Sequence, residues 1–194
     1  ASLPRQLTFG VGSTLSAICG FWVWNGESRA QSMCFRMLDA LSRHGPDGAA
    51  LHPDRRHHAD GARATASAIA LGHRLLKITA EDEFEAQPLV AAAGSADGEG
   101  AIWLVADARI DNRAELAGRL GIEAAEAATM SDSAFLLRAW QRWGTECVQH
   151  LLGAFAFAVW DTQAEELFLA RDHAGDRPLY FRSDADGFAF ATTA

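Results

Sequence analysis

The chain has 194 residues, of which 49% are hydrophobic, and its 25 acidic and 17 basic side chains give a net charge of −8. This size and composition are typical of one globular domain with a core of its own. The charges are scattered without a basic patch, which argues against binding to nucleic acid or to an anionic membrane surface. No apolar run approaches the ~20 residues that cross a bilayer. The three cysteines stand far apart, which indicates reduced thiols in a cytoplasmic protein.

The first part of the chain predicts strands around one helix. Residues 1–17 are interrupted by proline and glycine, so we expect an irregular extension rather than a signal peptide. The aromatic-rich stretch 19–24 predicts a buried strand. Residues 28–42 predict an amphipathic helix, because their apolar side chains recur at i, i+3, i+4 and i+7 on a single face. Further short strands are expected at residues 48–52, 56–60 and 66–73.

The middle of the chain predicts one strand and two helices. The strand covers residues 101–110, and a short helix follows at 112–120 with Asp111 as its expected N-cap. A second helix is expected to begin after Ser131, another residue type that caps helices well. It should end at Gly144, since glycine commonly stops helices.

The last fifty residues give the clearest strand pattern. The stretch 153–161, "GAFAFAVWD", places large side chains on one face and mostly alanines on the other. Both faces of this strand can therefore be covered by other layers, and we expect it to be central in its sheet. The stretches "LFLARD", "PLYFRSD" and "FAFATT" then predict an antiparallel meander. Strands at both ends with helices between them indicate an α+β fold of two sheets with helices outside.

Eight stretches, in this order, resemble one family. They are "CGF", "RHGPDG", "LGHRLL", "QPL", "DARIDNRAEL", "SDSAFLL", "LLGAFAFAVWD" and "ARDHAGDRPLYF". Together they resemble the glutaminase domain of asparagine-synthetase-like enzymes, a class II glutamine amidotransferase with the N-terminal-nucleophile hydrolase fold. The resemblance covers residues 18–194 and implies a four-layer α/β/β/α sandwich of antiparallel sheets.

The resemblance also implies a partner domain. In the family an ATP-dependent synthetase domain follows the glutaminase domain. The resemblance to the glutaminase domain extends to residue 194, so the C-terminal synthetase domain is expected to be absent from this chain. ATP and magnesium are then expected only in that domain, and no cofactor or metal in this one. His57 and His58 have no further spaced histidine or cysteine pair, so an exposed segment is favoured over a metal site.

Cys19 occupies the position of the family nucleophile. In the family this cysteine is the first residue, and its own α-amino group takes the thiol proton. An α-amine has a pKa near ~8, so part of it is neutral at physiological pH. The nitrogen of Cys19 is instead an amide with Ile18, which has no basicity unless the preceding 18 residues are removed.

The expected oxyanion hole is also altered. The family pattern Asn-Gly-Glu corresponds here to Asp107, Ala108 and Arg109. An ionised aspartate is only an acceptor, so Asp107 would repel the oxyanion that the family asparagine stabilises. Loss of one such donor lowers a rate by about 10²–10³.

The groups that hold glutamine are changed as well. Leu75 stands where the family has an arginine that binds the glutamine carboxylate, and Arg74 should point to the opposite face of its strand. The acid that holds the glutamine ammonium is kept as Asp132, but Arg109 would repel that ammonium. We therefore expect Arg109 to pair with Asp132, and also with Asp107, and to plug the pocket.

These substitutions favour a degenerate, non-hydrolytic glutaminase-like domain of an ATP-dependent amide-bond-forming enzyme. "DARIDNRAEL" and "GDRPLYF" are most similar to lasso-peptide cyclases, in which the amine comes from the substrate itself. The domain would then contact its synthetase domain, a peptide substrate or a partner protein, and a homodimer is left open. Two alternatives remain: an active glutaminase supplying ammonia for asparagine synthesis, and a self-standing N-terminal-nucleophile amidohydrolase.

Overall fold

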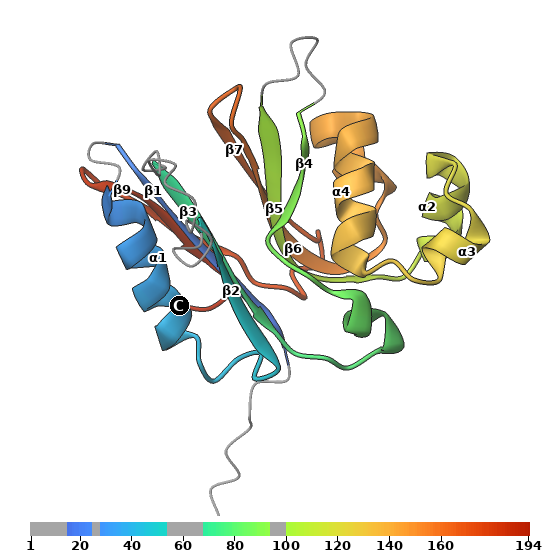
Figure 1. Cartoon of the computed structure of the whole chain (residues 1–194), viewed down its shortest axis with the longest axis horizontal. Helices are drawn as coiled ribbons and strands as arrows, with labels where there is room; N and C mark the ends of the chain where they lie inside the picture. Colours follow the sequence, from blue (N-terminus) through green and yellow to red (C-terminus); the bar gives the residue numbers. More distant parts are fainter. Residues whose placement is uncertain (1–14, 25–27, 54–67, 94–99) are drawn as a thin grey trace, which may run out of the picture.

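The computed structural model describes residues 15–24, 28–53, 68–93 and 100–194. Two antiparallel sheets pack face to face, with helices on the outer face of each (Figure 1). Sheet A has the strand order β2-β3-β1-β9-β8, and sheet B has the order β4-β5-β6-β7. The four-layer α+β sandwich expected from the sequence is therefore confirmed.

The strands of sheet A are β1 (Ala17–Val23), β2 (Gly48–His52), β3 (Ile69–Leu75), β8 (Tyr180–Ser183) and β9 (Gly187–Ala191). Those of sheet B are β4 (Leu89–Ala92), β5 (Ala101–Ile110), β6 (Gly153–Asp161) and β7 (Glu166–Arg171). The helices are α1 (Ser28–Ala40), α2 (Arg113–Leu120), α3 (Ala124–Ala127) and α4 (Asp132–Trp143), with short 3₁₀ helices η2 (Ala80–Phe84) and η3 (Gly144–His150). None of the described helices is long and apolar enough to cross a membrane.

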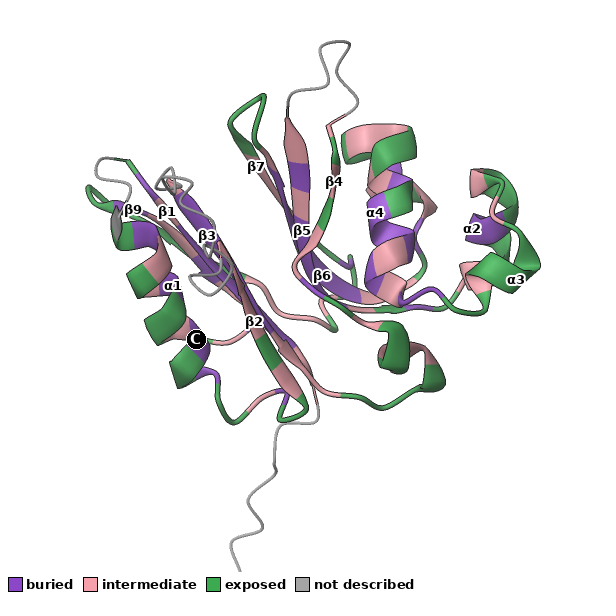
Figure 2. Ribbon diagram, in the orientation of Figure 1, coloured by how far each residue is buried: buried purple, intermediate pink, exposed green. Residues whose placement is uncertain are grey.

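Each sheet has its own outer core, and a third core fills the space between the sheets. The apolar face of α1 packs on sheet A through Ala30, Cys34 and Leu38, as the helical spacing predicted. Helix α4 packs on sheet B, and α2 and α3 lie beyond α4 (Figure 1). The buried residues follow the central strands and the inner sides of α1 and α4 (Figure 2).

Strand β6 is an interior strand, as its two covered faces predicted. It lies between β5 and β7. Phe155 and Phe157 belong to the core beneath α4, whereas Ala158 belongs to the core between the sheets. The small side chains let the two sheets approach closely, and the large ones fill the space below the helix.

The expected meander at the C-terminal end is wrong in one connection. β7 pairs with β6 in sheet B, but β8 and β9 belong to sheet A. The chain therefore crosses from one sheet to the other over residues 172–179. Alternating side chains and polar turns predict strands, but they do not specify which sheet a strand joins.

The helix ends agree with most of the predicted caps. The Ser131 side chain accepts a hydrogen bond from the Ala134 backbone N–H at 3.3 Å, and Gly144 ends α4 with φ of 57°. The N-cap of α2 is Asn112 rather than Asp111. The strand expected at residues 56–60 lies outside the described residues.

Candidate active site

Cys19 lies inside β1 rather than at a free edge. Its backbone is flanked by Gly72 of β3 and Ala191 of β9. Its thiol points to the outer face of sheet A, where it is 0% exposed in the core beneath α1. The Sγ atoms of Cys19 and Cys34 are 3.9 Å apart. The thiol at the family nucleophile position is thus closed off from solvent.

The backbone before Cys19 is held in the sheet. The Ile18 N–H donates to Oγ1 of Thr192 at 3.1 Å, and the Thr192 N–H donates to the Ile18 carbonyl at the same distance. The nitrogen of Cys19 belongs to the peptide bond with Ile18. No proton acceptor is therefore available at the place where the family uses an α-amine.

Asp107 lies on β5, on the face that points toward sheet A. It is two residues from Val105 on the same face of the strand, and Val105 belongs to the core between the sheets. Its Oδ1 is 3.2 Å from Nε of Arg177, and the two side chains are 6% and 17% exposed. Burial raises the pKa of Asp107 to about 6, against the lowering effect of the Arg177 charge. The position expected to hold an oxyanion donor therefore carries an internal ion pair.

Asp172 shapes the loop that brings Arg177 to Asp107. Its buried carboxylate accepts backbone hydrogen bonds from Phe155 at 3.2 Å, Asp176 at 2.9 Å and Arg177 at 3.0 Å. Burial by itself would raise the pKa of Asp172, but the backbone N–H groups outweigh burial and lower it. The crossing between the sheets is therefore fixed by one carboxylate.

Replacing Asp172 with asparagine is expected to lower the free energy of unfolding by about 1.5–3 kcal/mol at pH 7, the usual contribution of hydrogen bonds to a charged group. Because the folded pKa is lowered, this contribution is present above the unfolded pKa of ~3.9 and is lost as the pH falls through the folded value. Urea unfolding at neutral and acid pH measures the difference. Asp161→Asn is the matched control, since Asp161 also accepts two backbone N–H groups but at an exposed turn. Equal effects of the two substitutions would contradict the prediction.

Asp132 begins α4 and is already bonded within the domain. Its Oδ2 accepts a hydrogen bond from the Ile110 N–H at 3.0 Å, and its Oδ1 forms an ion pair with Nη1 of Arg113. Nη2 of Arg113 also donates to the carbonyls of Ala127 and Met130. Burial raises the pKa of Asp132, and the Ile110 hydrogen bond and Arg113 oppose this rise.

The expected role of Arg109 is wrong. Its Nε lies 3.3 Å from Oδ1 of Asp111, and both side chains are largely exposed. Within the described residues Arg109 forms no ion pair with Asp107 or Asp132. Arg109 is near the end of β5, where its side chain reaches solvent. Asp111, two residues further along the chain, lies within ion-pair distance of it there.

Arg74 points to the outer face of β3, opposite to its neighbours His73 and Leu75, as the alternation of side chains along a strand predicted. His73 is buried and Leu75 is half-buried, and both lie on the face of Leu71, which belongs to the core between the sheets. Nε of Arg74 donates instead to the Leu38 carbonyl of α1 at 3.0 Å. Arg74 therefore does not replace the carboxylate-binding arginine of the family.

The structure does not gather the predicted positions into one open pocket. The Cys19 thiol faces α1, Asp107 faces the space between the sheets, and Asp132 caps the end of β5. Ala108 lies on the opposite face of β5, half-buried against the core beneath α4. Among the described residues no group of three or more histidine, cysteine or acidic side chains is arranged to hold a metal. His57 and His58 lie outside these residues.

Sequence reasoning missed three polar residues at this end of the sandwich. Arg113 and Arg177 bind the two carboxylates, and Gln87 bonds the Ala106 backbone through both ends of its amide, at 2.9 and 2.5 Å. All three stand inside the quoted motifs "DARIDNRAEL", "GDRPLYF" and "QPL". Their place inside these motifs could have marked them as candidate site residues, but the group that each one binds could be found only from the fold.

The comparisons with known proteins agree with this architecture. The family described as "Glutamine amidotransferase domain" matches residues 15–194. Asparagine synthetase [glutamine-hydrolyzing] 3 of Bacillus subtilis is 30% identical over 157 residues, which is 81% of this chain and 23% of that protein. A putative asparagine synthetase [glutamine-hydrolyzing] of Mycobacterium tuberculosis is 43% identical over 90 residues, which is 46% of this chain and 14% of that protein. The chain thus spans less than a quarter of the length of these relatives.

A solved structure shares the fold. Glutamine phosphoribosylpyrophosphate amidotransferase from B. subtilis, complexed with ADP and GMP, superposes with a TM-score of 0.67 over 91% of this chain and 41% of that chain, at 20% identity. At this identity the likeness shows the N-terminal-nucleophile hydrolase fold and nothing more. The family match over residues 15–194 and the likeness to asparagine synthetases lead to one conclusion: the chain belongs to the class II glutamine amidotransferase domains of the asparagine synthetase family.

Proposed function

We propose that this domain does not hydrolyse glutamine and instead has a structural or binding role in an ATP-dependent amide-bond-forming enzyme. The observation that carries the proposal is the state of Cys19. Its thiol is fully buried and its nitrogen is an amide within β1, so the nucleophile has neither substrate access nor a base. Orientation and a base are both needed for thiol attack.

The two carboxylates at the glutamine-pocket positions support the same proposal. Asp132 is paired with Arg113, and Asp107 with Arg177. An ammonium group arriving at Asp132 would have to displace a guanidinium that also bonds two carbonyls. With Leu75 in place of an arginine, a glutamine carboxylate would meet no fixed cation there.

The motifs favour a lasso-peptide cyclase as the parent enzyme. "DARIDNRAEL" contains Arg113 and "GDRPLYF" contains Arg177, so the stretches most similar to cyclases supply both ion-pair arginines. A cyclase needs no ammonia, because an amine of the peptide attacks the activated carboxylate. The proposed partner is a synthetase domain, which would hold ATP and magnesium, and the proposed location is the cytoplasm.

The test is a glutamine hydrolysis assay on this chain and on a chain that begins at Cys19. We expect neither to release glutamate at a rate near the ~10 s⁻¹ that is typical of enzymes. Asp107→Asn restores the family residue at one position, and it should remain inactive because the other groups are still missing.

Two outcomes would contradict the proposal. Rapid glutamate release by the 194-residue chain would show that Cys19 is reached and activated in spite of its burial. Release only by the chain that begins at Cys19 would favour the active glutaminase alternative, in which residues 1–18 are removed. The mass of the protein isolated from its own cells then shows whether that removal occurs.

A further inference from the structure

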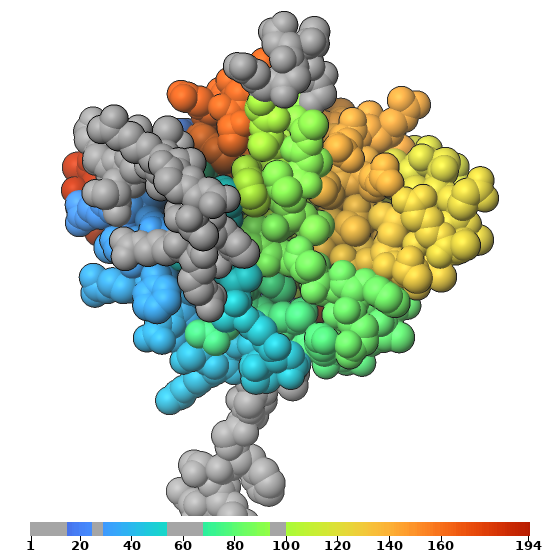
Figure 3. All heavy atoms as spheres, in the orientation of Figure 1, coloured from blue at the N-terminus to red at the C-terminus, as the bar shows by residue number. Residues whose placement is uncertain are grey.

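The outer face of sheet A carries a groove between α1 and β2. Helix α1 packs over β1 and β3 through its buried face. The groove lies beside the helix, along β2. The cavity measures about 690 Å³. This volume lies within the roughly 300–1,000 Å³ of small-molecule sites. The atoms of α1 (blue) and β2 (cyan) lie side by side on one face of the molecule (Figure 3).

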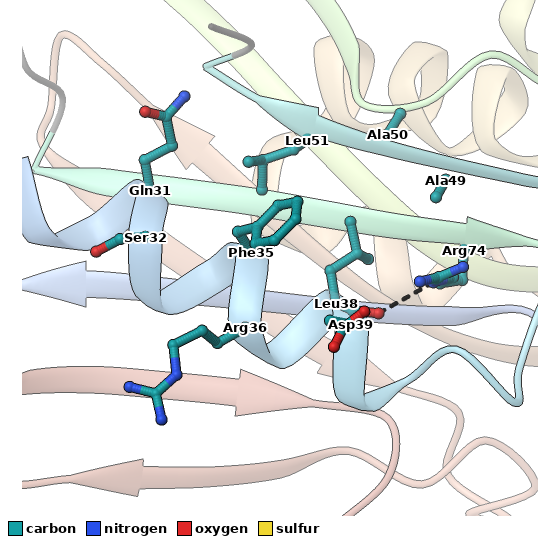
Figure 4. A pocket seen from close by; sticks show the side chains of 10 residues that line it. All are labelled: Gln31, Ser32, Phe35, Arg36, Leu38, Asp39, Ala49, Ala50, Leu51 and Arg74. Atoms are coloured by element: carbon teal, nitrogen blue, oxygen red, sulfur yellow. Dashed lines mark hydrogen bonds between the residues drawn. The ribbon is translucent and has the colours of Figure 1, made fainter.

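The walls of the groove are mainly apolar. Phe35 and Leu38 reach from α1 toward the strands, and Leu51 of β2 lies opposite them (Figure 4). Phe35 is 62% exposed, so it retains surface that a ligand can cover. Ala49 and Ala50 of β2 have small side chains, which leave the space open.

One end of the groove carries a cation with free donors. Arg74 is paired in register with Ala49, and its Nε donates to the Leu38 carbonyl at 3.0 Å. Its two terminal nitrogens form no hydrogen bond or ion pair with any residue in the described part of the chain. The guanidinium is therefore held in place by α1, while the fork that binds carboxylates remains available.

The charge around the groove favours an anion. Two arginines, Arg36 and Arg74, line it against one acid, Asp39, in a chain whose net charge is −8. Arg36 extends away from Leu51, whereas Arg74 lies at the end of the groove opposite Gln31 (Figure 4). Among the ion pairs of the described residues, none joins Arg74 to Asp39. Arg74 is thus the group that can receive an anion inside the groove.

We propose that this groove binds a small apolar carboxylic acid. The carboxylate pairs with the terminal nitrogens of Arg74, and the apolar part lies against Phe35, Leu38 and Leu51. The groove is on the outer face of sheet A, away from Asp107 and Asp132. The result of its test is therefore independent of whether the domain hydrolyses glutamine.

The test compares 3-phenylpropanoate with 3-phenylpropanamide, which has the same shape without the charge. Binding is followed by NMR chemical shifts of the whole chain at neutral pH. We expect the acid to bind with a dissociation constant on the order of 1 mM, as suits a fragment of this size. The amide should bind about tenfold more weakly, since a charge-assisted hydrogen bond is the stronger kind.

Three variants locate the site. Arg74→Gln should weaken binding of the acid about tenfold and leave the amide unchanged, because only the charge is lost. Arg29→Gln is the matched control and should change neither, since Arg29 is also an arginine of α1 but does not line the groove and is paired with Asp186. Ala49→Trp fills the groove beside Arg74 while keeping the charge of Arg74, so it should abolish binding of both compounds even if Arg74→Gln disturbs the end of α1.

Each other result overturns the proposal. Equal binding of acid and amide would remove the role of the charge, and unchanged binding in Ala49→Trp would place the compounds elsewhere. No binding of the acid at ~10 mM would mean that the groove does not take this class of ligand. Sedimentation of the wild-type chain as a dimer that Phe35→Ser dissociates would assign the groove to a second copy of the chain.

Discussion

Replacing Arg113 with alanine is expected to lower the free energy of unfolding by about 3 kcal/mol, the lower end of the 3–5 kcal/mol for breaking a buried ion pair. The substitution leaves the Asp132 carboxylate without its counter-ion, and it removes the donor to the carbonyls of Ala127 and Met130. The lower end applies because the Arg113 and Asp132 side chains are still 22% and 18% exposed. Urea unfolding at pH 7 provides the measurement.

Arg109→Ala is the matched control for this prediction. Arg109 is also an arginine paired with an aspartate, but its side chain is 71% exposed and that of Asp111 is 60% exposed. Exposed pairs contribute about 0–1 kcal/mol, so this substitution should be nearly neutral. Equal losses in the two variants would show that burial does not decide the value of the pair.

A double substitution separates the ion pair from the packing around it. Asp132→Asn keeps an oxygen that can accept the Ile110 N–H while it removes the charge. In that background Arg113→Met should cost clearly less than it does in the wild type, because no buried charge is left unpaired. Additive losses would mean that Arg113 acts through its contacts with the two carbonyls and through its packing over the Phe135 ring. The centre of that ring lies 4.6 Å from the guanidinium carbon of Arg113.

The sequence predicted the layers well because the signals for them are periodic. The Ala and Phe faces of β6 and the apolar face of α1 each specify what they pack against. The sheet crossing after β7 was missed, because it depends on Asp172 holding backbone groups several residues away. Strand alternation carries no information about such a contact.

The candidate site was predicted less completely, and the reason is geometric. Alternation along β3 placed Arg74 on the outer face correctly. The same argument placed Arg109 on one face with Asp107, but it did not show that Arg109 lies where the strand end meets solvent. The pairing of Asp107 with Arg177 joins residues 70 positions apart in the sequence, and only the fold brings them together.

The two buried titratable groups His73 and Asp107 are expected to give opposite dependences of stability on pH. Burial lowers the pKa of His73 from 6.5 to about 4 and raises the pKa of Asp107 from 3.8 to about 6. Between pH 4 and 6.5 unfolding lets His73 bind a proton, so its contribution to stability grows as the pH rises. Between pH 4 and 6 the folded state holds a proton on Asp107 that the unfolded state releases, so its contribution falls as the pH rises. Each effect amounts to roughly 3 kcal/mol, at 1.36 kcal/mol per pKa unit.

Neutral substitutions should therefore change the pH dependence in opposite directions. Relative to the wild type, Asp107→Asn should make the free energy of unfolding rise more steeply from pH 4 to 6, because the opposing carboxylate is gone. His73→Leu should make it rise less steeply or fall, because His73 no longer offsets the effect of Asp107. Asp39→Asn, at an exposed site, controls for the loss of one charge. Urea unfolding at pH 4, 5, 6 and 7 gives the slopes of the free energy of unfolding against pH. Comparison with the wild type cancels the contributions of the other titrating groups to these slopes. One of them is His52, whose pKa burial also lowers to about 4. Slopes that shift in the same direction in both variants would show that burial between the sheets does not set these two pKa values.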